Sequence, residues 1–297
     1  MHFNFIKNTV LLFVLTLLSC RNNSNSQSLV SNKSAVILGA QQTEYYLPIL
    51  KNKNIGIVAN QTSVIFKTTG STHLVDSLLS LNINVKKVFA PEHGFRGTAD
   101  AGEYVTDGID AGSGIPIVSL YGANKIPDAA ILSDLEVVIF DIQDVGARFY
   151  TFLSTLHYMM ETCAKLGITV LVLDRPNPNG HYVDGPTLDL NHSSFVGVHP
   201  VPVVHGMTVG EYAQMINGEG WLKEGVKCDL KVIPIRNYTH STTYQLPINP
   251  SPNLPNSKAI NLYPSLCFFE GTNMSMGRGT ENQFQVIGSP YLKGDLY

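Results

Sequence analysis

The chain has 297 residues, of which 44% are hydrophobic and only 14% are charged, with a formal net charge of -3. This composition excludes an intrinsically disordered chain, which combines low hydrophobicity with high charge. It also argues against nucleic acid as a partner, because no basic excess exists to neutralise phosphates. The length suggests roughly two domains, on a prior of about 150 residues for each.

The N-terminal segment has the pattern of an export signal. An apolar run from Val10 to Leu18 leads into Ser19-Cys20, and it is too short to span a bilayer. Leu17-Leu18-Ser19-Cys20 resembles a bacterial lipobox, with a plain secretory signal and an incidental cysteine as the alternative. We expect a lipoprotein signal over 1–20 and an Asn/Ser-rich tether over 21–34. Lipidation of Cys20 is expected to anchor the exported protein in the outer membrane, facing the periplasm.

Apolar runs and helical patterns alternate through the next 150 residues. Helical spacing predicts helices over 71–81, with Ser71 as N-cap, and over 147–166, closed by Gly167. Apolar or β-branched runs predict strands over 55–59, 137–142 and 168–173, and strand-like segments are predicted over 85–90, which ends at Pro91, and over 115–121. Such alternation indicates a parallel sheet covered on both faces. Residues 35–185 are therefore expected to form a Rossmann-like, doubly wound α/β domain.

The pattern changes after Gly185. A helix is predicted over 208–217, with Thr208 as N-cap and Glu211 completing a capping box. A strand over 231–235 and a Pro-rich loop over 249–256 follow. We expect residues 186–297 to form a second, smaller α/β domain. The sequence has no G-x-G-x-x-G after its first strand, no P-loop and no G-x-S-x-G turn, so no cofactor is expected.

Polar clusters directly follow three of the predicted strands, where open α/β sheets bind their ligands. Each cluster alone is weak evidence, because loops are generally polar. Asp144 could instead cap the helix that begins near Ala147, and each arginine could form a surface salt bridge. The candidate residues are Glu92, His93 and Arg96 in the first cluster, Asp141, Asp144 and Arg148 in the second, and Asp174, Arg175, Asn177 and Asn179 in the third.

A fourth cluster, between Tyr263 and Thr280, places small polar residues around Asn273 and Arg278. Converging carboxylates suit general acid/base chemistry, and glycoside hydrolysis needs an acid with a second carboxylate as base, nucleophile or orienting group. Arginine forks suit a carboxylate or phosphate on the ligand. Tyr263, Phe268 and Phe269 could form a sugar platform, although core packing is the expected role of the two Phe.

Six motifs occur in a fixed order along the chain. They are Pro91-Glu-His-Gly-Phe-Arg-Gly97, Phe140-Asp-Ile-Gln-Asp-Val-Gly-Ala-Arg-Phe-Tyr-Thr151, Asp174-Arg-Pro-Asn-Pro-Asn-Gly180 with Gly185-Pro186, His205-Gly-Met-Thr208 with Gly210-Glu211, Pro252-Asn-Leu-Pro255, and Glu270-Gly-Thr-Asn273 with Gly277-Arg-Gly-Thr280. Together, from about Ile37 to the end, they closely resemble the exo-β-N-acetylmuramidase family (NamZ-like). Two features depart from that family: Gln283 stands where Pro is usual, and the chain stops early, so we expect the second domain to be incomplete.

The resemblance implies a peptidoglycan-recycling glycosidase that removes N-acetylmuramic acid from the non-reducing end of glycan fragments. It implies a Rossmann-like domain plus a smaller α/β domain, with the site in the cleft between them. It also implies Glu92 as the leading catalytic residue, which we expect to be the general acid. Asp141 or Asp144 is expected to be the second carboxylate, acting on water or orienting the 2-acetamido group.

The other candidates are expected to bind the substrate. Arg96, Arg148 and Arg278 are candidates for the lactyl carboxylate of muramic acid. Hydroxyl groups of the sugar are assigned to Asn177, Asn179 and Asn273, and further contacts to His93, Asp174 and Arg175.

Two alternatives stay open. The first is a non-catalytic lipoprotein that binds cell-wall glycan with the same residues. The second is a metal-dependent hydrolase using His93, Asp141, Asp144, His181 or His205. The histidines lack metal-ligand spacing, so no metal is expected. The sequence makes no prediction of the oligomeric state.

Overall fold

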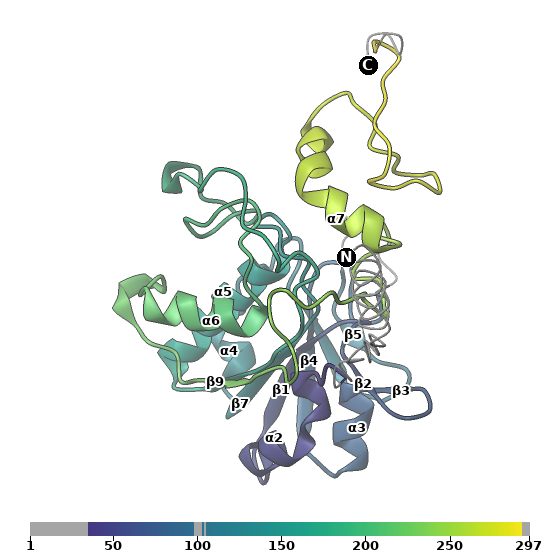
Figure 1. The fold of residues 1–297 in the computed structure, drawn as a ribbon. Helices are drawn as coiled ribbons and strands as arrows, with labels where there is room; N and C mark the ends of the chain where they lie inside the picture. The colour runs from purple at the N-terminus through teal and green to yellow at the C-terminus, as the bar shows by residue number, and fades with distance from the viewer. Residues whose placement is uncertain (1–34, 98–102, 104, 293–297) are drawn as a thin grey trace, which may run out of the picture. The chain divides into compact units, whose positions relative to one another are not determined.

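A seven-stranded sheet forms the centre of the computed structural model, which describes residues 35–97, 103 and 105–292 (Figure 1). Its order is β5-β6-β4-β1-β7-β8-β9, and every neighbouring pair is parallel except β5 with β6. Its strands are β1 (Ile55–Ala59), β4 (Val85–Ala90), β5 (Gly108–Ile109), β6 (Pro116–Ser119), β7 (Val137–Asp141), β8 (Thr169–Leu173) and β9 (Leu230–Ile233). The Rossmann-like α/β class predicted from the sequence is confirmed.

Helices cover both faces of the sheet. Strand β1 shows the division, because Ile55 and Ile57 pack with α2 and α3, whereas Val58 packs with α5 and α6. Figure 1 shows α2 and α3 apart from α4, α5 and α6. The helices are α2 (Thr43–Leu50), α3 (Leu74–Ser80), α4 (Ala129–Leu132), α5 (Phe152–Leu166), α6 (Val209–Gly218) and α7 (Ser257–Leu266), with short 3-10 turns η1 (Gly39–Gln41), η2 (Leu190–His192), η3 (Lys223–Gly225) and η4 (Cys267–Gly271).

Two predicted helices begin later than expected. Helix α3 starts at Leu74 and is capped by His73, not Ser71. Residues 71–73 instead form strand β3 (Ser71–His73), which pairs antiparallel with β2 (Val64–Phe66). Helix α5 starts at Phe152, because the preceding backbone pairs with residues 203–204 of another loop. Its end is as predicted, since Gly167 adopts the left-handed conformation with φ 67°.

Helix α6 begins at the predicted capping box. Thr208 Oγ1 accepts from the Glu211 amide at 3.2 Å, and Glu211 Oε2 accepts from the Thr208 amide at 2.8 Å. Strand β9 then pairs with β8, so the sheet extends beyond residue 185. The domain division at that residue stays a prediction.

The predicted signal, Cys20 and tether lie outside the described residues. Within the part of the chain that is described, no helix combines the length and apolarity needed to cross a bilayer.

The strand order reverses at β1 and β7, at their carboxyl ends. The chain runs from β1 outward to β4 and β6, then returns to β7 on the other side of β1. Connections on the two sides therefore diverge above these two strands, which is where open α/β sheets bind ligands. Strand β4, next to β1, ends at Ala90, and Pro91 and Glu92 follow directly.

Candidate active site

Glu92 lies in a tight turn directly after β4. The turn is closed by a hydrogen bond from the Gly94 amide to the Pro91 carbonyl at 3.0 Å. His93 within it is buried and has φ 72°. A non-glycine residue in this conformation stores backbone strain of about 1–3 kcal/mol, and such strain clusters at functional sites. The turn presents the half-buried carboxylate of Glu92 to a cavity beyond the sheet edge.

Two hydroxyl groups fix the Glu92 carboxylate. Tyr121, which follows β6, donates to Oε1 at 2.9 Å, and Thr151, the N-cap of α5, donates to Oε2 at 2.8 Å. Burial and the charge of Glu92 raise the pKa of Tyr121 to about 12, so this hydroxyl stays protonated at neutral pH. The carboxyl group is thereby oriented from two different elements of the fold.

The cavity has a volume of about 820 Å³, within the range of ligand sites. Its lining comes from both sides of the boundary expected at residue 185. Of the predicted site residues, it brings together Glu92, His93, Arg148 and Arg278. The other eight predicted residues lie outside this lining: Arg96, Asp141, Asp144, Asp174, Arg175, Asn177, Asn179 and Asn273.

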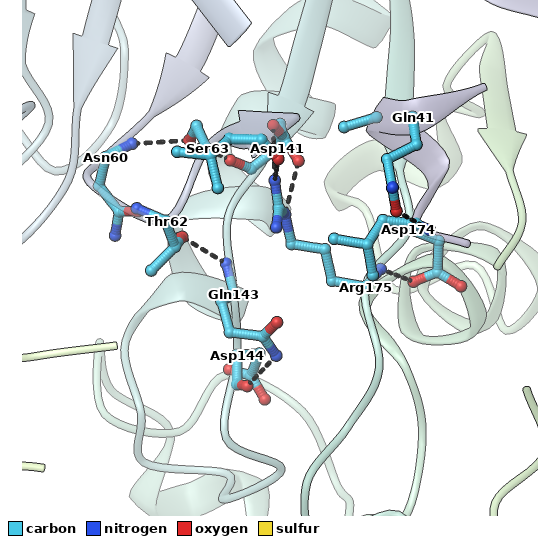
Figure 2. Close-up of polar contacts among 12 residues, drawn as sticks. Gln41, Asn60, Thr62, Ser63, Asp141, Gln143, Asp144, Asp174 and Arg175 are labelled. Atoms are coloured by element: carbon cyan, nitrogen blue, oxygen red, sulfur yellow. Dashed lines mark hydrogen bonds and ion pairs between the residues drawn. The ribbon is translucent and has the colours of Figure 1, made fainter. Parts of the chain in front are cut away.

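Asp141 and Arg175 form a buried ion pair (Figure 2). Arg175 Nε lies 2.6 Å from Asp141 Oδ1, and Nη2 lies 2.9 Å from Oδ2, while Asp141 is 0% exposed. The carbonyl of Asp141 also accepts from the Ser63 hydroxyl. These contacts join the ends of β1, β7 and β8, and favour a structural role for both side chains over contact with a substrate.

Asp144 is buried beside His205, with Oδ2 and His205 Nε2 3.7 Å apart. Oδ2 accepts from the Gly146 amide at 2.6 Å, whereas Oδ1 and His205 Nε2 have no hydrogen-bond partner among the described residues. Asp144 does not cap α5, which begins at Phe152 with Thr151 at the N-cap position. The helix-capping alternative for Asp144 is therefore wrong.

The third cluster connects loops with each other. Asp174 accepts from the Thr208 hydroxyl at 2.8 Å and the Gly210 amide at 2.7 Å, at the start of α6. Asn177 donates to the carbonyl of Met207 at 2.8 Å. Buried Asn179 donates to the carbonyls of Val145, at 2.8 Å, and Ile260, at 3.2 Å. In this structure these side chains are used internally, which disfavours direct contact with a sugar.

The three candidate arginines have different surroundings. Arg96 pairs with Asp110 through Nε at 3.2 Å and Nη2 at 2.8 Å, which holds the pKa of Asp110 down to about 2. Arg278 lines the cavity, with Nη1 2.9 Å from Glu270 Oε1. Arg148 also lines it, and its Nη1 donates to the carbonyls of Pro186 and Val201, each at 2.7 Å.

One wall of the cavity is aromatic. The ring of Phe149 lies edge-on to Tyr263 at 5.5 Å and to Phe268 at 5.3 Å. Phe268 is 57% exposed and lines the cavity, so its expected role in core packing is wrong. Phe269 is half-buried and packs against the core, as expected. Exposed aromatic rings suit the apolar faces of sugars, while Asn273 is exposed and lies elsewhere.

Several residues of the cavity were not among the predicted site residues. Tyr121 is the last residue of a predicted strand, so the strand-end rule gives a signal that could have found it. Glu270 belongs to the last motif, but nothing in the sequence pairs it with Glu92 in one cavity. Lys125 and Phe195 carry no sequence signal, because each is an isolated residue in a loop.

The residues named for a metal-dependent hydrolase are dispersed. His93 lines the main cavity, His181 a separate one, and His205 lies beside Asp144. Among residues 35–97, 103 and 105–292, no three His, Cys, Asp or Glu side chains group closely enough to hold a metal ion.

A Rossmann-like sheet whose strand-end carboxylate faces an aromatic-walled cavity defines the class of protein as an α/β enzyme suited to glycosidic bonds. Residues 55–258 match the family model "Exo-beta-N-acetylmuramidase NamZ, N-terminal", and residues 261–297 match its C-terminal counterpart. The chain belongs to the exo-β-N-acetylmuramidase NamZ family and is an enzyme of the glycosidase class. The family resemblance expected from the six motifs is confirmed.

Relatives of known name and structure agree with this membership. The chain is 37% identical to the peptidoglycan β-N-acetylmuramidase NamZ of Bacillus subtilis (strain 168), covering 98% of this chain and 70% of the relative. Two crystal structures of DUF1343 family proteins from Bacteroides fragilis NCTC 9343 are similar. One is 52% identical with a TM-score of 0.79, covering 88% of this chain and 69% of that chain. The other is 30% identical with a TM-score of 0.78, covering 88% and 67%.

Proposed function

We propose that this enzyme is an exo-acting β-N-acetylmuramidase that releases N-acetylmuramic acid from the non-reducing end of peptidoglycan fragments, in cell-wall turnover and recycling. The name of the Bacillus subtilis relative and the match to both family models support the activity. The observation that carries the proposal is the Glu92 carboxylate, oriented by two hydroxyl groups at the edge of a cavity large enough for sugars.

In this mechanism Glu92 is the general acid, which donates a proton to the leaving glycosidic oxygen as the bond to the anomeric carbon breaks. The hydroxyl groups of Tyr121 and Thr151 can each donate or accept a hydrogen bond. They can therefore hold the carboxyl group in one orientation both before and after proton transfer. Orientation matters because the proton must be delivered along the line to the leaving oxygen.

The geometry changes the candidate for the second carboxylate. Asp141 and Asp144 were its predicted sites, but neither lines the cavity. Among the described residues, Glu270 is the other carboxylate of the lining, paired with Arg278. We propose Glu270 as the first residue to test for activating water or orienting the substrate. The 2-acetamido group of the substrate can supply its own nucleophile, so a covalent enzyme intermediate is not required.

The proposed activity is tested with the disaccharide N-acetylmuramyl-N-acetylglucosamine, labelled at its reducing end. The wild-type chain is expected to release unlabelled N-acetylmuramic acid, and Glu92→Gln to lose at least about a hundredfold in turnover. Glu219→Gln, an exposed Glu-to-Gln change at the C-cap of α6, is the matched control and should keep wild-type activity. Near wild-type turnover by Glu92→Gln refutes the acid assignment. Binding without turnover by folded wild-type protein favours the glycan-binding alternative.

We also propose that the protein is exported and lipid-anchored through Cys20. The lipobox-like sequence supports this, and an outer-membrane position facing the periplasm brings the enzyme to its polymer. In cells, the wild-type protein should fractionate with membranes and incorporate labelled fatty acid. Cys20→Ser should do neither, and membrane association that survives this change contradicts the anchor.

A further inference from the structure

Among the described residues, three strongly basic side chains line the cavity: Lys125, Arg148 and Arg278. Glu270 neutralises Arg278 through the 2.9 Å ion pair. Arg148 is held against the wall by two backbone carbonyl oxygens, each 2.7 Å from its Nη1. The positive charge of Arg278 is therefore cancelled by a carboxylate, whereas Arg148 donates to uncharged carbonyl groups.

Lys125 contacts aromatic rings. Its Nζ lies 4.6 Å from the centroid of the Phe195 ring and 6.0 Å from that of Tyr121. Within the described part of the chain, no carboxylate comes within 4.0 Å of Nζ. A cation–π contact holds an ammonium group in place but leaves its charge uncancelled. The half-buried Lys125 therefore offers a positioned cation to an anionic ligand.

The aromatic support of Lys125 is itself held by a helix. The Phe195 ring stacks on Tyr158 of α5, with centroids 6.2 Å apart and an interplanar angle of 4°. It also lies 6.3 Å from the ring of Tyr121. Because α5 packs in the core, the ring under the ammonium group has a defined place. Less ordering is then needed when a ligand binds.

The same Tyr121 connects Lys125 to the reacting end of the cavity. Its ring is near the ammonium group, while its hydroxyl donates to Glu92 Oε1 at 2.9 Å. Glu92 and Lys125 thus contact the same Tyr121 side chain in the lining of one cavity. Muramic acid differs from glucosamine by the 3-O-lactyl ether, whose carboxylate is the negative charge that the glucosamine ring lacks.

We propose that Lys125 binds the lactyl carboxylate of the substrate and so selects N-acetylmuramic acid over N-acetylglucosamine. This inference rests on the proposed function and names its specificity residue. It replaces the sequence prediction of Arg96, Arg148 and Arg278 for this carboxylate, since Arg148 Nη1 already donates to two backbone carbonyls. Arg96 lies outside the cavity and pairs with Asp110, and Arg278 already has a carboxylate partner. A charge-assisted hydrogen bond from Lys125 is roughly twice as strong as a neutral one.

The test is a double-mutant cycle that removes one charge from the enzyme and the other from the substrate. Lys125→Met keeps an unbranched side chain against Phe195, and Lys125→Gln is a second neutral variant. Lys165→Met, an exposed Lys-to-Met change on α5, is the matched control. The substrates are 4-nitrophenyl N-acetyl-β-muramide and its lactyl amide, which has the same shape without the charge.

We expect Lys125→Met and Lys125→Gln to lower kcat/KM on the muramide by at least tenfold and on the lactyl amide by less than twofold. The preference for the muramide over 4-nitrophenyl N-acetyl-β-glucosaminide should fall by the same factor as the loss on the muramide. Lys165→Met should change none of these values. Equal losses on the charged and the amide substrate, or no loss on either, overturn the proposal.

A direct binding measurement separates this inference from the proposed activity. If the wild-type protein hydrolyses none of the three substrates, the proposed activity fails, and Lys125 is tested by titration calorimetry with free N-acetylmuramic acid. A Kd at least tenfold weaker for Lys125→Met than for wild type supports the carboxylate site. An equal Kd, or absence of binding by folded wild-type protein, overturns it.

Discussion

Asp141 and Arg175 form a two-pronged ion pair inside the fold, with Nε 2.6 Å from Oδ1 and Nη2 2.9 Å from Oδ2. Asp141 ends β7 and Arg175 follows β8, so the pair links neighbouring strands at their carboxyl ends (Figure 2). Asp141 was predicted to be catalytic, and Arg175 was predicted to bind the substrate. Their mutual contact indicates that they stabilise the carboxyl ends of two neighbouring strands of the sheet.

Breaking this ion pair is expected to lower the free energy of unfolding of the protein. Asp141→Asn leaves the Arg175 charge buried and only partly paired, which costs about 3–5 kcal/mol in the free energy of unfolding. The measurement is urea unfolding at neutral pH. Lys165→Ala, which removes one side of the exposed Lys165–Glu224 pair, is the control and should cost less than about 1 kcal/mol.

The two roles of Asp141 predict different kinetics for Asp141→Asn. If the pair is structural, molecules that stay folded at low temperature keep a kcat within a few-fold of wild type. A small loss of stability together with a hundredfold loss of kcat would instead restore Asp141 as the second carboxylate.

Asp174 should give stability a pH dependence of defined sign. Burial raises its pKa from 3.8 to about 6, although the Gly210 amide and the Thr208 hydroxyl donate to it. The native state therefore binds this proton more tightly than the unfolded chain does. The resulting contribution to stability is full below about pH 3.8 and is lost as pH rises through about 6.

Urea unfolding from pH 4.5 to 7 checks this sign in wild type and Asp174→Asn. The wild-type free energy of unfolding, minus that of the variant, should fall over this range. The total change from full protonation to full ionisation is up to about 3 kcal/mol, since one pKa unit corresponds to 1.36 kcal/mol. The variant's missing charge can shift this difference by a constant amount, but a constant does not change how the difference varies with pH. A difference that rises with pH contradicts the assignment.

General acid catalysis by Glu92 predicts a dependence on the leaving group. A sugar hydroxyl leaves poorly without a proton, whereas 2,4-dinitrophenol leaves without one. Glu92→Gln should therefore lose at least about a hundredfold in kcat on the disaccharide. On 2,4-dinitrophenyl N-acetyl-β-muramide the loss should be severalfold at most. Equal losses on both substrates indicate that Glu92 binds the sugar and does not protonate it.

Two glycines with positive φ should differ in their tolerance of alanine. Gly146 has φ 79°, and an added Cβ would come 2.6 Å from Asn177 Nδ2. That amide cannot move freely, because it donates to the carbonyl of Met207. Gly167 has φ 67° and open space around its missing Cβ. The two sites thus share the backbone strain but not the steric overlap.

Gly167→Ala should lower the free energy of unfolding by about 1–2 kcal/mol, which is the cost of the left-handed conformation for alanine. Gly146→Ala should lower it by about 1–3 kcal/mol more, because of overpacking. Urea unfolding of both variants checks the order. Equal losses would mean that the loop around Asn177 adjusts to the extra methyl group.

The predictions that held depend on neighbours in the chain. Strand β4 has the predicted bounds, because it ends at Ala90, immediately before Pro91. Helix α6 begins at its capping box, and α5 ends at Gly167. Helix α5 starts later than predicted because residues 147–148 pair with a loop more than fifty residues away. Local spacing holds no information about that contact.

The sequence by itself determined the alternating α/β elements, the motif order of the family, and Glu92 as a strand-end carboxylate. Those features follow from side chains a few positions apart, which set periodicity, capping and turns. Only the tertiary structure decided that Asp141 faces Arg175 and that Lys125 lies over Phe195 in the cavity of Glu92. The physical reason is that the order of parallel strands and the closure of long loops choose which distant side chains meet. The chain has few charged residues, and the fold determines how those that line the cavity are paired.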